Sequence, residues 1–158
     1  SLMFTGSNYG KGEEAIDYYL SIFKHTNEGH LARYPKGMEP DKEGMIMYAD
    51  FNILDQWFAL MESARSHHYS FNEAISFLVY CDTQEEIDDY WDKLSAVPEA
   101  EQCGWLKDKF GVSWQIVPRD MDEMMSNGTA EQIDQVNKVV LNMKKLDLEE
   151  IRKAYKED

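Results

Sequence analysis

Alternating apolar and polar positions are clearest in residues 103–118, which read CGWLKDKFGVSWQIVP. Two short apolar and aromatic runs flank a polar turn that contains Lys107 and Asp108 and ends at Gly111. After the turn, large apolar residues alternate with residues that carry a hydroxyl or an amide. Because successive side chains of a strand point to opposite faces of a sheet, this pattern predicts a β-hairpin with a charged tip, one apolar face and one half-polar face.

The rest of the chain is predicted to form two cycles of strand, helix and further strands. The two helices align without gaps, since Ile16 matches Ile87 and Tyr19 matches Tyr90 at an offset of 71 residues. The predicted strands are residues 2–5, 25–35, 45–54, 56–63 and a buried strand at 74–81, followed by further strands within 99–117. The predicted helices are residues 13–24 and a segment that starts at Thr83, with Glu86 completing a capping box, and ends near Leu94.

The C-terminal residues have a helical pattern. Thr129 and Gln132 form a second capping box before an amphipathic stripe that runs from Ile133 to Met143. A last short helix is predicted to begin at Asp147 and to end near Tyr155. The stripe is expected to pack on the sheet or against a second copy of the chain, and nothing in it indicates catalysis.

Together these elements predict an α+β fold in one structural domain. Residues 1–72 are expected to form a first βαβββ module and residues 73–119 a second one. Residues 120–158 are expected to form a helical extension.

Composition and charge exclude several classes of partner. The 158 residues are 43% hydrophobic and 13% aromatic, which is typical of a folded globular chain. The net charge of −14 disfavours nucleic acids and anionic membranes, because both need a basic surface. No apolar run reaches the roughly 18 residues of a transmembrane helix, and no signal peptide is visible. Cys81 and Cys103 follow no metal-binding spacing, so a cytoplasmic protein with reduced thiols is expected.

One motif resembles a dinucleotide-binding fingerprint. Gly10, Gly12 and Ala15 have the spacing G-x-G-x-x-A between a predicted strand and a predicted helix. However, Glu13 and Glu14 would place two negative charges where a pyrophosphate should bind. The later sequence also predicts hairpins rather than repeated parallel crossovers, so these glycines are expected to turn the chain.

The histidines are the next candidates for chemistry. With Glu28 or Glu62 they could assemble a metal site, because histidine and carboxylate suit zinc, iron or manganese. They follow no fixed metal-ligand spacing, which favours solvated surface side chains. The four histidines are His25, His30, His67 and His68.

Several segments resemble a known family, the PhnB-like, demethylubiquinone-methyltransferase-like branch of the glyoxalase/bleomycin resistance/dioxygenase (vicinal oxygen chelate) superfamily. The resemblance implies two βαβββ modules, each curling a sheet around a cavity, and commonly a homodimer. The segments that carry it are residues 13–23 (EEAIDYYLSIF), 82–94, 104–108 (GWLKD), 111–115 (GVSWQ) and 143–148 (MKKLDL).

The resemblance also implies where a metal would bind. Enzymes of the superfamily hold a divalent metal with four side chains from the first and last strands of the two modules. The matching positions here are Phe4, Glu62, Ile75 and Gln115. Because phenylalanine and isoleucine cannot coordinate a metal and an amide is a weak ligand, neither a bound metal nor another cofactor is expected.

We therefore predict a cytoplasmic protein that binds a small apolar or aromatic molecule, forms a homodimer and contacts neither nucleic acid nor membrane. The predicted pocket residues are Phe4, Glu62, Ile75, Phe77, Trp105, Ser113, Trp114 and Gln115.

Two alternatives stay open. One is a metal-dependent lyase, dioxygenase or resistance enzyme that uses His30, Glu62, His67 or His68. The other is methyl transfer to a quinone-like phenol, although the chain lacks the parallel-sheet context of the usual glycine-rich loop for a methyl donor.

Overall fold

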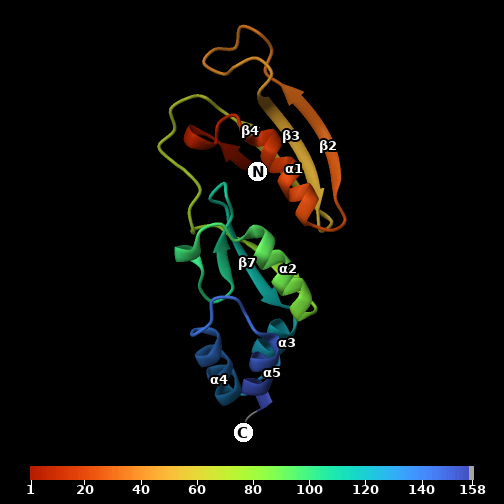
Figure 1. Cartoon of the computed structure of the whole chain (residues 1–158), viewed down its shortest axis with the longest axis vertical. Coiled ribbons are helices and arrows are strands. Elements are labelled where there is room, and N and C mark those ends of the chain that lie inside the picture. The colour runs from red at the N-terminus through yellow and green to blue at the C-terminus, as the bar shows by residue number, and fades with distance from the viewer. Residues whose placement is uncertain (157–158) are drawn as a thin grey trace. The chain divides into compact units, whose positions relative to one another are not determined.

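The computed structural model describes residues 1–156 and divides into two compact units, Ser1–Ser70 and Phe71–Asp158. Each unit contains one mixed sheet with a helix on it (Figure 1). The predicted α+β class with C-terminal helices is confirmed. In the part of the chain that the structure describes, no helix is long and apolar enough to cross a membrane.

The first unit is a four-stranded sheet with one α-helix. Its elements are β1 (Leu2–Phe4), the 3-10 helix η1 (Gly6–Asn8), α1 (Gly12–Ile22), β2 (Asn27–Arg33), β3 (Ile46–Ile53) and β4 (Gln56–Glu62). The strand order is β1-β4-β3-β2, with β1 parallel to β4 and the other pairs antiparallel. The β3–β4 hairpin turns at Leu54 and Asp55, as predicted, and both residues have the positive φ angles (50° and 61°) that a tight two-residue hairpin turn favours.

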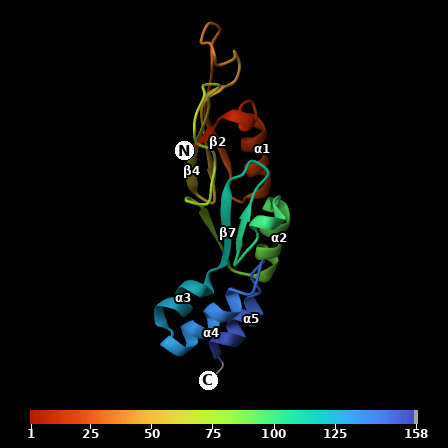
Figure 2. The same cartoon turned by 90° about the vertical axis from the view of Figure 1, so that its left-hand side faces the viewer.

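The helix α1 covers one face of this sheet (Figure 2). Its Tyr19 ring stacks on Phe51 of β3, with the ring centroids 6.0 Å apart, and Phe51 stacks in turn on Phe58 of β4. The alternation along β3 and β4 therefore directs Phe51, Phe58 and Leu60 towards the helix. Tyr48 and Trp57, at positions of the opposite parity, are exposed.

The second unit has a smaller sheet and four α-helices. Its elements are β5 (Phe77–Cys81), α2 (Gln84–Leu94), the 3-10 helix η2 (Pro98–Ala100), β6 (Trp105–Lys107), β7 (Ser113–Pro118), α3 (Asp120–Asn127), α4 (Ala130–Val140) and α5 (Leu148–Lys156). The strand order is β5-β7-β6, with β5 parallel and β6 antiparallel to β7.

Two strands follow α2, whereas the expected βαβββ module has three. The segment before β6 turns instead of extending. Pro98 starts the 3-10 helix, and Cys103 and Gly104 have φ angles of 53° and 82°. The strand predicted at residues 74–81 is also shorter and half-buried. It begins at Phe77, and within it Val79 and Cys81 are buried while Leu78 and Tyr80 are exposed.

Both predicted N-cap residues cap their helices, but the predicted capping box is complete only at Thr129. The Thr83 hydroxyl accepts a hydrogen bond from the Glu86 amide, while the Glu86 carboxylate accepts from the amide of Asp82 rather than from that of Thr83. At Thr129 both bonds of the capping box form with Gln132. The helix α3 has no counterpart in the predicted elements.

The tip of the β6–β7 hairpin carries the expected charged residues, but one of them, Asp108, is fully buried. Its Oδ1 atom accepts hydrogen bonds from the amides of Phe110 (2.9 Å) and Val112 (3.0 Å). Its Oδ2 atom accepts one from the indole Nε1 of Trp114 (2.9 Å). This carboxylate therefore organises the turn and orients the tryptophan that follows it.

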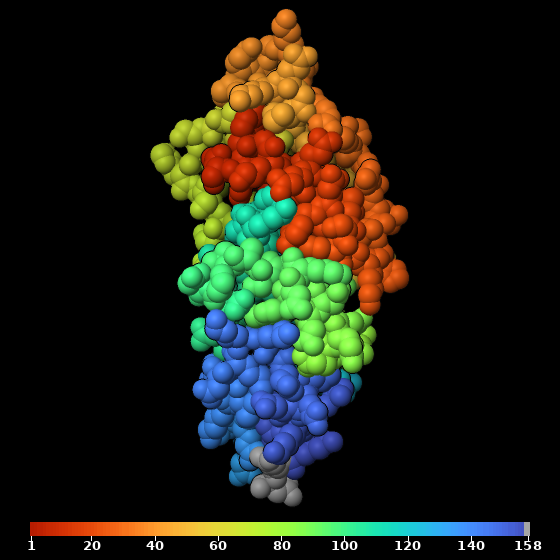
Figure 3. All heavy atoms as spheres, in the orientation of Figure 1, coloured from red at the N-terminus to blue at the C-terminus, as the bar shows by residue number. Residues whose placement is uncertain are grey.

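The C-terminal helices share a hydrophobic core with the segment that joins α4 to α5. Buried members include Met124, Val136, Leu146 and Ile151, and Cys103 and Val117 pack against them. In the space-filling view the atoms of this region (blue) border directly on those of α2 (green) (Figure 3). These helices are thus an integral part of the second unit.

In the first unit, a buried carboxylate holds three chain segments together. Glu62, at the end of β4, is 2% exposed. Its Oε1 atom accepts hydrogen bonds from the amides of Gly10 (2.7 Å) and Gly12 (3.0 Å), and its Oε2 atom accepts one from the amide of Ile46 (2.8 Å). The carboxylate therefore joins the start of α1 and the start of β3 to β4.

These bonds explain the glycine motif. Gly10 has a φ angle of 87°, which side chains rarely adopt, and a Cβ atom on Gly12 would lie 2.9 Å from the Glu62 carboxyl carbon. The amides that would bind a phosphate in a dinucleotide fold are occupied by Glu62. As predicted, the glycines shape the chain.

We predict that Glu62→Gln lowers the free energy of unfolding by about 2–4 kcal/mol, because one oxygen of the acceptor pair becomes an NH2 group that faces backbone N–H donors. Urea denaturation at neutral pH measures the change. The matched control is Glu43→Gln, which alters an exposed carboxylate of the same unit and should leave stability unchanged. Equal stability of the two variants would contradict this role of Glu62.

Candidate functional site

The predicted pocket residues are divided between the two units. Phe4 and Glu62 are neighbours on β1 and β4 of the first unit, and both are buried. All acceptor contacts of the Glu62 carboxylate described above are to backbone amides. The structure thus gives Glu62 a structural role, and a role in ligand binding stays a prediction.

In the second unit, five of the predicted residues lie on the three-stranded sheet. Phe77 pairs with Trp114, and their ring centroids are 5.2 Å apart. Trp114 is buried and bonded to Asp108, so it belongs to the inner face. Trp105 pairs with Gln115 on the adjacent strands β6 and β7. The fifth residue is Ser113, which is buried, and its hydroxyl oxygen has no hydrogen-bond partner among the described residues.

Gln115 faces away from Trp114, as the alternation predicted. It is half-buried, and its Nε2 atom donates a hydrogen bond to the Ser76 hydroxyl (2.8 Å). Since Trp105 and Gln115 are paired residues on neighbouring strands, their side chains lie on the same face of the sheet. Ile75 does not join this group, because it precedes β5 and is 74% exposed.

A hollow of about 460 Å³ opens beside Trp105. Its lining is contributed by the segment before β5, by η2 and the turn after it, by β6 and by the end of α4. The lining residues are Glu73, Ala100, Gln102, Cys103, Trp105 and Leu141.

Trp105 is the predicted pocket residue among these, and the sequence patterns did not identify the others. They come from segments far apart in the chain, and no motif links them. The one local signal is the Cys103–Gly104 pair before β6, where the alternation pattern predicted a strand and the positive φ angles form a turn.

The charged group of the hollow is the carboxylate of Glu73. It forms an ion pair with Lys107 of β6, and this side-chain hydrogen bond holds the pKa of Glu73 below its usual value. Glu73 is therefore ionised at neutral pH. Its side chain is 61% exposed, so solvent screens the pair. The hollow combines an aromatic ring and aliphatic groups with one anionic acceptor.

The four positions at which the family resemblance implies metal ligands do not fit a metal ion here. Phe4 and Ile75 carry no donor atom, both Glu62 oxygens accept backbone hydrogen bonds, and Gln115 is a neutral amide. Among residues 1–156, no group of three or more His, Cys, Asp and Glu side chains is arranged to hold a metal ion. His67 contacts the hydroxyl of Ser63 through its Nε2 atom (3.1 Å).

Comparison with known proteins identifies the family. The model of the 3-demethylubiquinone-9 3-methyltransferase family matches residues 1–117. The PhnB protein from Bacillus cereus shares 34% sequence identity, with 75% of this chain and 97% of that chain covered and a TM-score of 0.62. Protein PA1353 from Pseudomonas aeruginosa is 18% identical over 74% of this chain and 92% of that chain, with a TM-score of 0.57, which shows a likeness of fold alone.

No curated protein matches the chain. The family match covers most of the chain, and its range includes the two predicted helices and the hairpin that carry the resemblance. The chain therefore belongs to the PhnB-like, 3-demethylubiquinone-9 3-methyltransferase family.

Proposed function

We propose that this chain is a cytoplasmic small-molecule-binding protein whose ligand occupies the hollow beside Trp105 without the help of a metal ion. The observation that carries the proposal is the hollow itself. Its volume of about 460 Å³ falls in the range of small-molecule sites, roughly 300–1,000 Å³. Such sites combine mostly apolar walls with a few placed polar groups, and this lining has that character.

The neighbouring sheet face supports the proposal. Trp105 offers a half-buried aromatic ring for a flat ligand, and ring stacking contributes about 0.5–1.5 kcal/mol beyond the burial of area. The amide of Gln115, on the same face, is held in orientation by its bond to Ser76. Its oxygen has no hydrogen-bond partner in the described part of the chain, so it is available to a ligand that donates.

The family name suggests methyl transfer as a second function, but the chain offers no specific feature for it. The glycine-rich segment that might cradle a nucleotide-type methyl donor is bonded to Glu62. Metal-dependent chemistry of the lyase or dioxygenase type would need donors at positions other than the four considered above. Binding is therefore the function that we propose.

We also propose that the protein is a homodimer. The faces of the two sheets that α1 and α2 leave open carry exposed apolar side chains, among them Trp57 (55% exposed), Leu78 and Tyr80. Apolar side chains gathered on a sheet face are typical of an interaction surface, and closed two-fold dimers are the commonest soluble assemblies. A second copy of the chain would remove such faces from water.

We predict no stoichiometric transition metal in protein purified without chelator, because the four candidate positions offer no suitable donor set. Elemental analysis by plasma mass spectrometry is the measurement. One zinc, iron or manganese ion per chain that survives gel filtration would contradict the metal-free proposal.

We predict that 2-naphthol, a flat neutral phenol, binds the wild-type chain and that Trp105→Ala weakens this binding about fivefold to tenfold, because a stacking surface is lost. Isothermal titration calorimetry gives the dissociation constants. The matched control is Trp57→Ala, which removes an exposed tryptophan of the first unit and should leave the constant unchanged. Equal effects of the two substitutions would show that the hollow beside Trp105 is not the site.

We predict that light scattering in ~0.15 M salt reports twice the 18.4 kDa chain mass, since salt at this level screens much of the repulsion between the acidic chains. A monomer that persists at high protein concentration would exclude the dimer. That result would leave the fold and the binding proposal intact.

A further inference from the structure

The C-terminal helices contribute to the hollow. Leu141, the C-cap residue that follows α4, is 64% exposed and forms part of the lining together with Trp105 and Cys103. An exposed leucine is unremarkable by itself. Here, however, it lies at the rim of a hollow that also contains an aromatic ring, and it lies beyond residues 1–117, which the family model matches.

The segment after Leu141 is fixed to the turn that precedes β6. The amide of Cys103 donates a hydrogen bond to the Met143 carbonyl (2.8 Å), and the amide of Gly104 donates one to the Lys144 carbonyl (2.8 Å). Gly104 also allows close packing, since a Cβ atom there would lie 3.1 Å from the Leu146 side chain. The wall that contains Leu141 is thus joined to the same turn that supplies Cys103 and Trp105 to the hollow.

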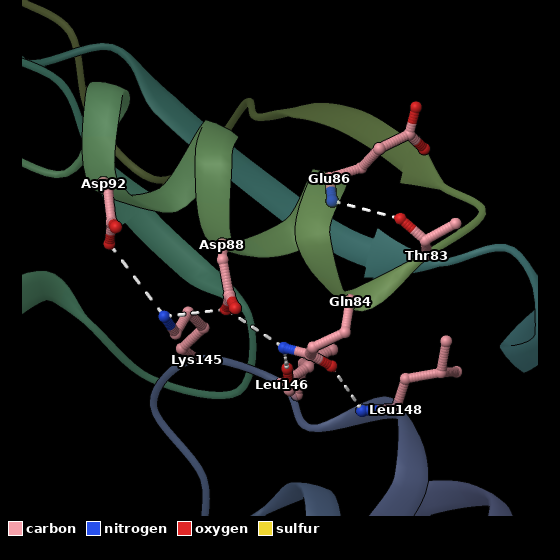
Figure 4. A network of polar contacts seen from close by, with 8 residues as sticks. All are labelled: Thr83, Gln84, Glu86, Asp88, Asp92, Lys145, Leu146 and Leu148. Carbon is pink, nitrogen blue, oxygen red and sulfur yellow. Dashed lines mark hydrogen bonds and ion pairs between the residues drawn. The ribbon is translucent and has the colours of Figure 1, made fainter.

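A second set of contacts holds this segment to α2 (Figure 4). The Gln84 amide group donates from Nε2 to the Leu146 carbonyl (3.2 Å) and accepts at Oε1 from the Leu148 amide (2.8 Å). Lys145 forms ion pairs with Asp88 (2.8 Å) and Asp92 (3.9 Å). With the buried side chains of Leu146 and Leu148, these bonds hold the segment in place.

We propose that Leu141 contacts the ligand and helps to determine specificity, and that the hollow takes a flat aromatic molecule that carries a hydrogen-bond donor and no negative charge. The proposal rests on the proposed function, since it names the ligand class of the same hollow. Leu141 and the Trp105 ring provide apolar contact for an aromatic ring. The donor pairs with the carboxylate of Glu73 or with the side chain of Gln102, both of which line the hollow.

The absence of negative charge on the ligand follows from the lining. The charged side chain among its residues is Glu73, which is ionised because Lys107 stabilises the carboxylate. Lys107 offsets much of the charge of this carboxylate, but an anionic ligand would still lie next to an acidic side chain in a chain whose net charge is −14. Both effects oppose its binding.

The test compares three probes of equal ring size: 2-naphthol, naphthalene and 2-naphthoate. We expect 2-naphthol to bind most tightly, naphthalene more weakly and 2-naphthoate most weakly, because only the first offers a donor without a charge. Titration calorimetry or probe fluorescence gives the constants. Tighter binding of 2-naphthoate than of 2-naphthol would overturn the ligand class.

The role of Leu141 is tested with Leu141→Asp, which exchanges an exposed apolar contact for a charge. We expect the dissociation constant for 2-naphthol to rise about tenfold or more, because an apolar contact is lost and a charge is brought against the ring. The matched control is Leu54→Asp, the same change at an exposed leucine of the first unit, which should leave the constant unchanged. Unaltered urea midpoints would show that both variants fold.

The outcomes separate this inference from the proposed function. If Leu141→Asp leaves 2-naphthol binding within about twofold of wild type while Trp105→Ala still weakens it, the wall from α4 is not part of the site and the inference fails alone. If 2-naphthol binds but Trp105→Ala has no effect, the site lies elsewhere and both fail. Absence of binding by all three probes would overturn both as well.

Discussion

The first unit depends on one buried carboxylate. Glu62 ends β4 and accepts backbone hydrogen bonds from the start of α1 and from the start of β3. Without it, the buried amides of Gly12 and Ile46 would lack an acceptor, and each unmet buried donor costs about 1–3 kcal/mol. The glycines of the preceding loop follow from the same constraint. Gly10 must adopt a positive φ angle, and Gly12 must let its chain approach the carboxylate closely.

The second unit uses a buried carboxylate in a comparable way, but at a position that is not equivalent. Asp108 lies in the β6–β7 turn rather than at the end of a strand, and it bonds two turn amides and an indole. In each unit a charged side chain is stable in the interior because backbone donors surround it. The internal repeat seen in the two helices therefore does not extend to the buried carboxylates, which lie at non-equivalent positions in the two units.

The spacing of apolar residues predicted an element correctly where the residues that form the local pattern are also the buried ones. The helices α1 and α2, the β3–β4 hairpin and the alternation in β7 follow from the spacing of their apolar residues. Other features depend on contacts that no local pattern records. Ser113 belongs to the polar parity of β7 but is buried, and residues 99–104 turn because of Pro98 and two positive φ angles. Of the residues that line the hollow, Trp105 was the one that a strand pattern could indicate. Glu73 and Leu141 are brought to the hollow only by the tertiary fold.

The structural role of Glu62 and metal binding both require the lone pairs of its carboxylate oxygens. A metal ligand must offer a lone pair to the ion, whereas both carboxylate oxygens here accept backbone N–H groups. If the carboxylate turned to a metal, it would leave buried donors of α1 and β3 without partners, and the loss in stability would offset the gain from coordination. The Glu62 carboxylate, at a position where the family resemblance implies a metal ligand, is therefore part of the fold. The hollow of the second unit is lined by an aromatic ring and aliphatic groups. Small-molecule binding there needs no metal ligand and no change in the buried hydrogen bonds of Glu62.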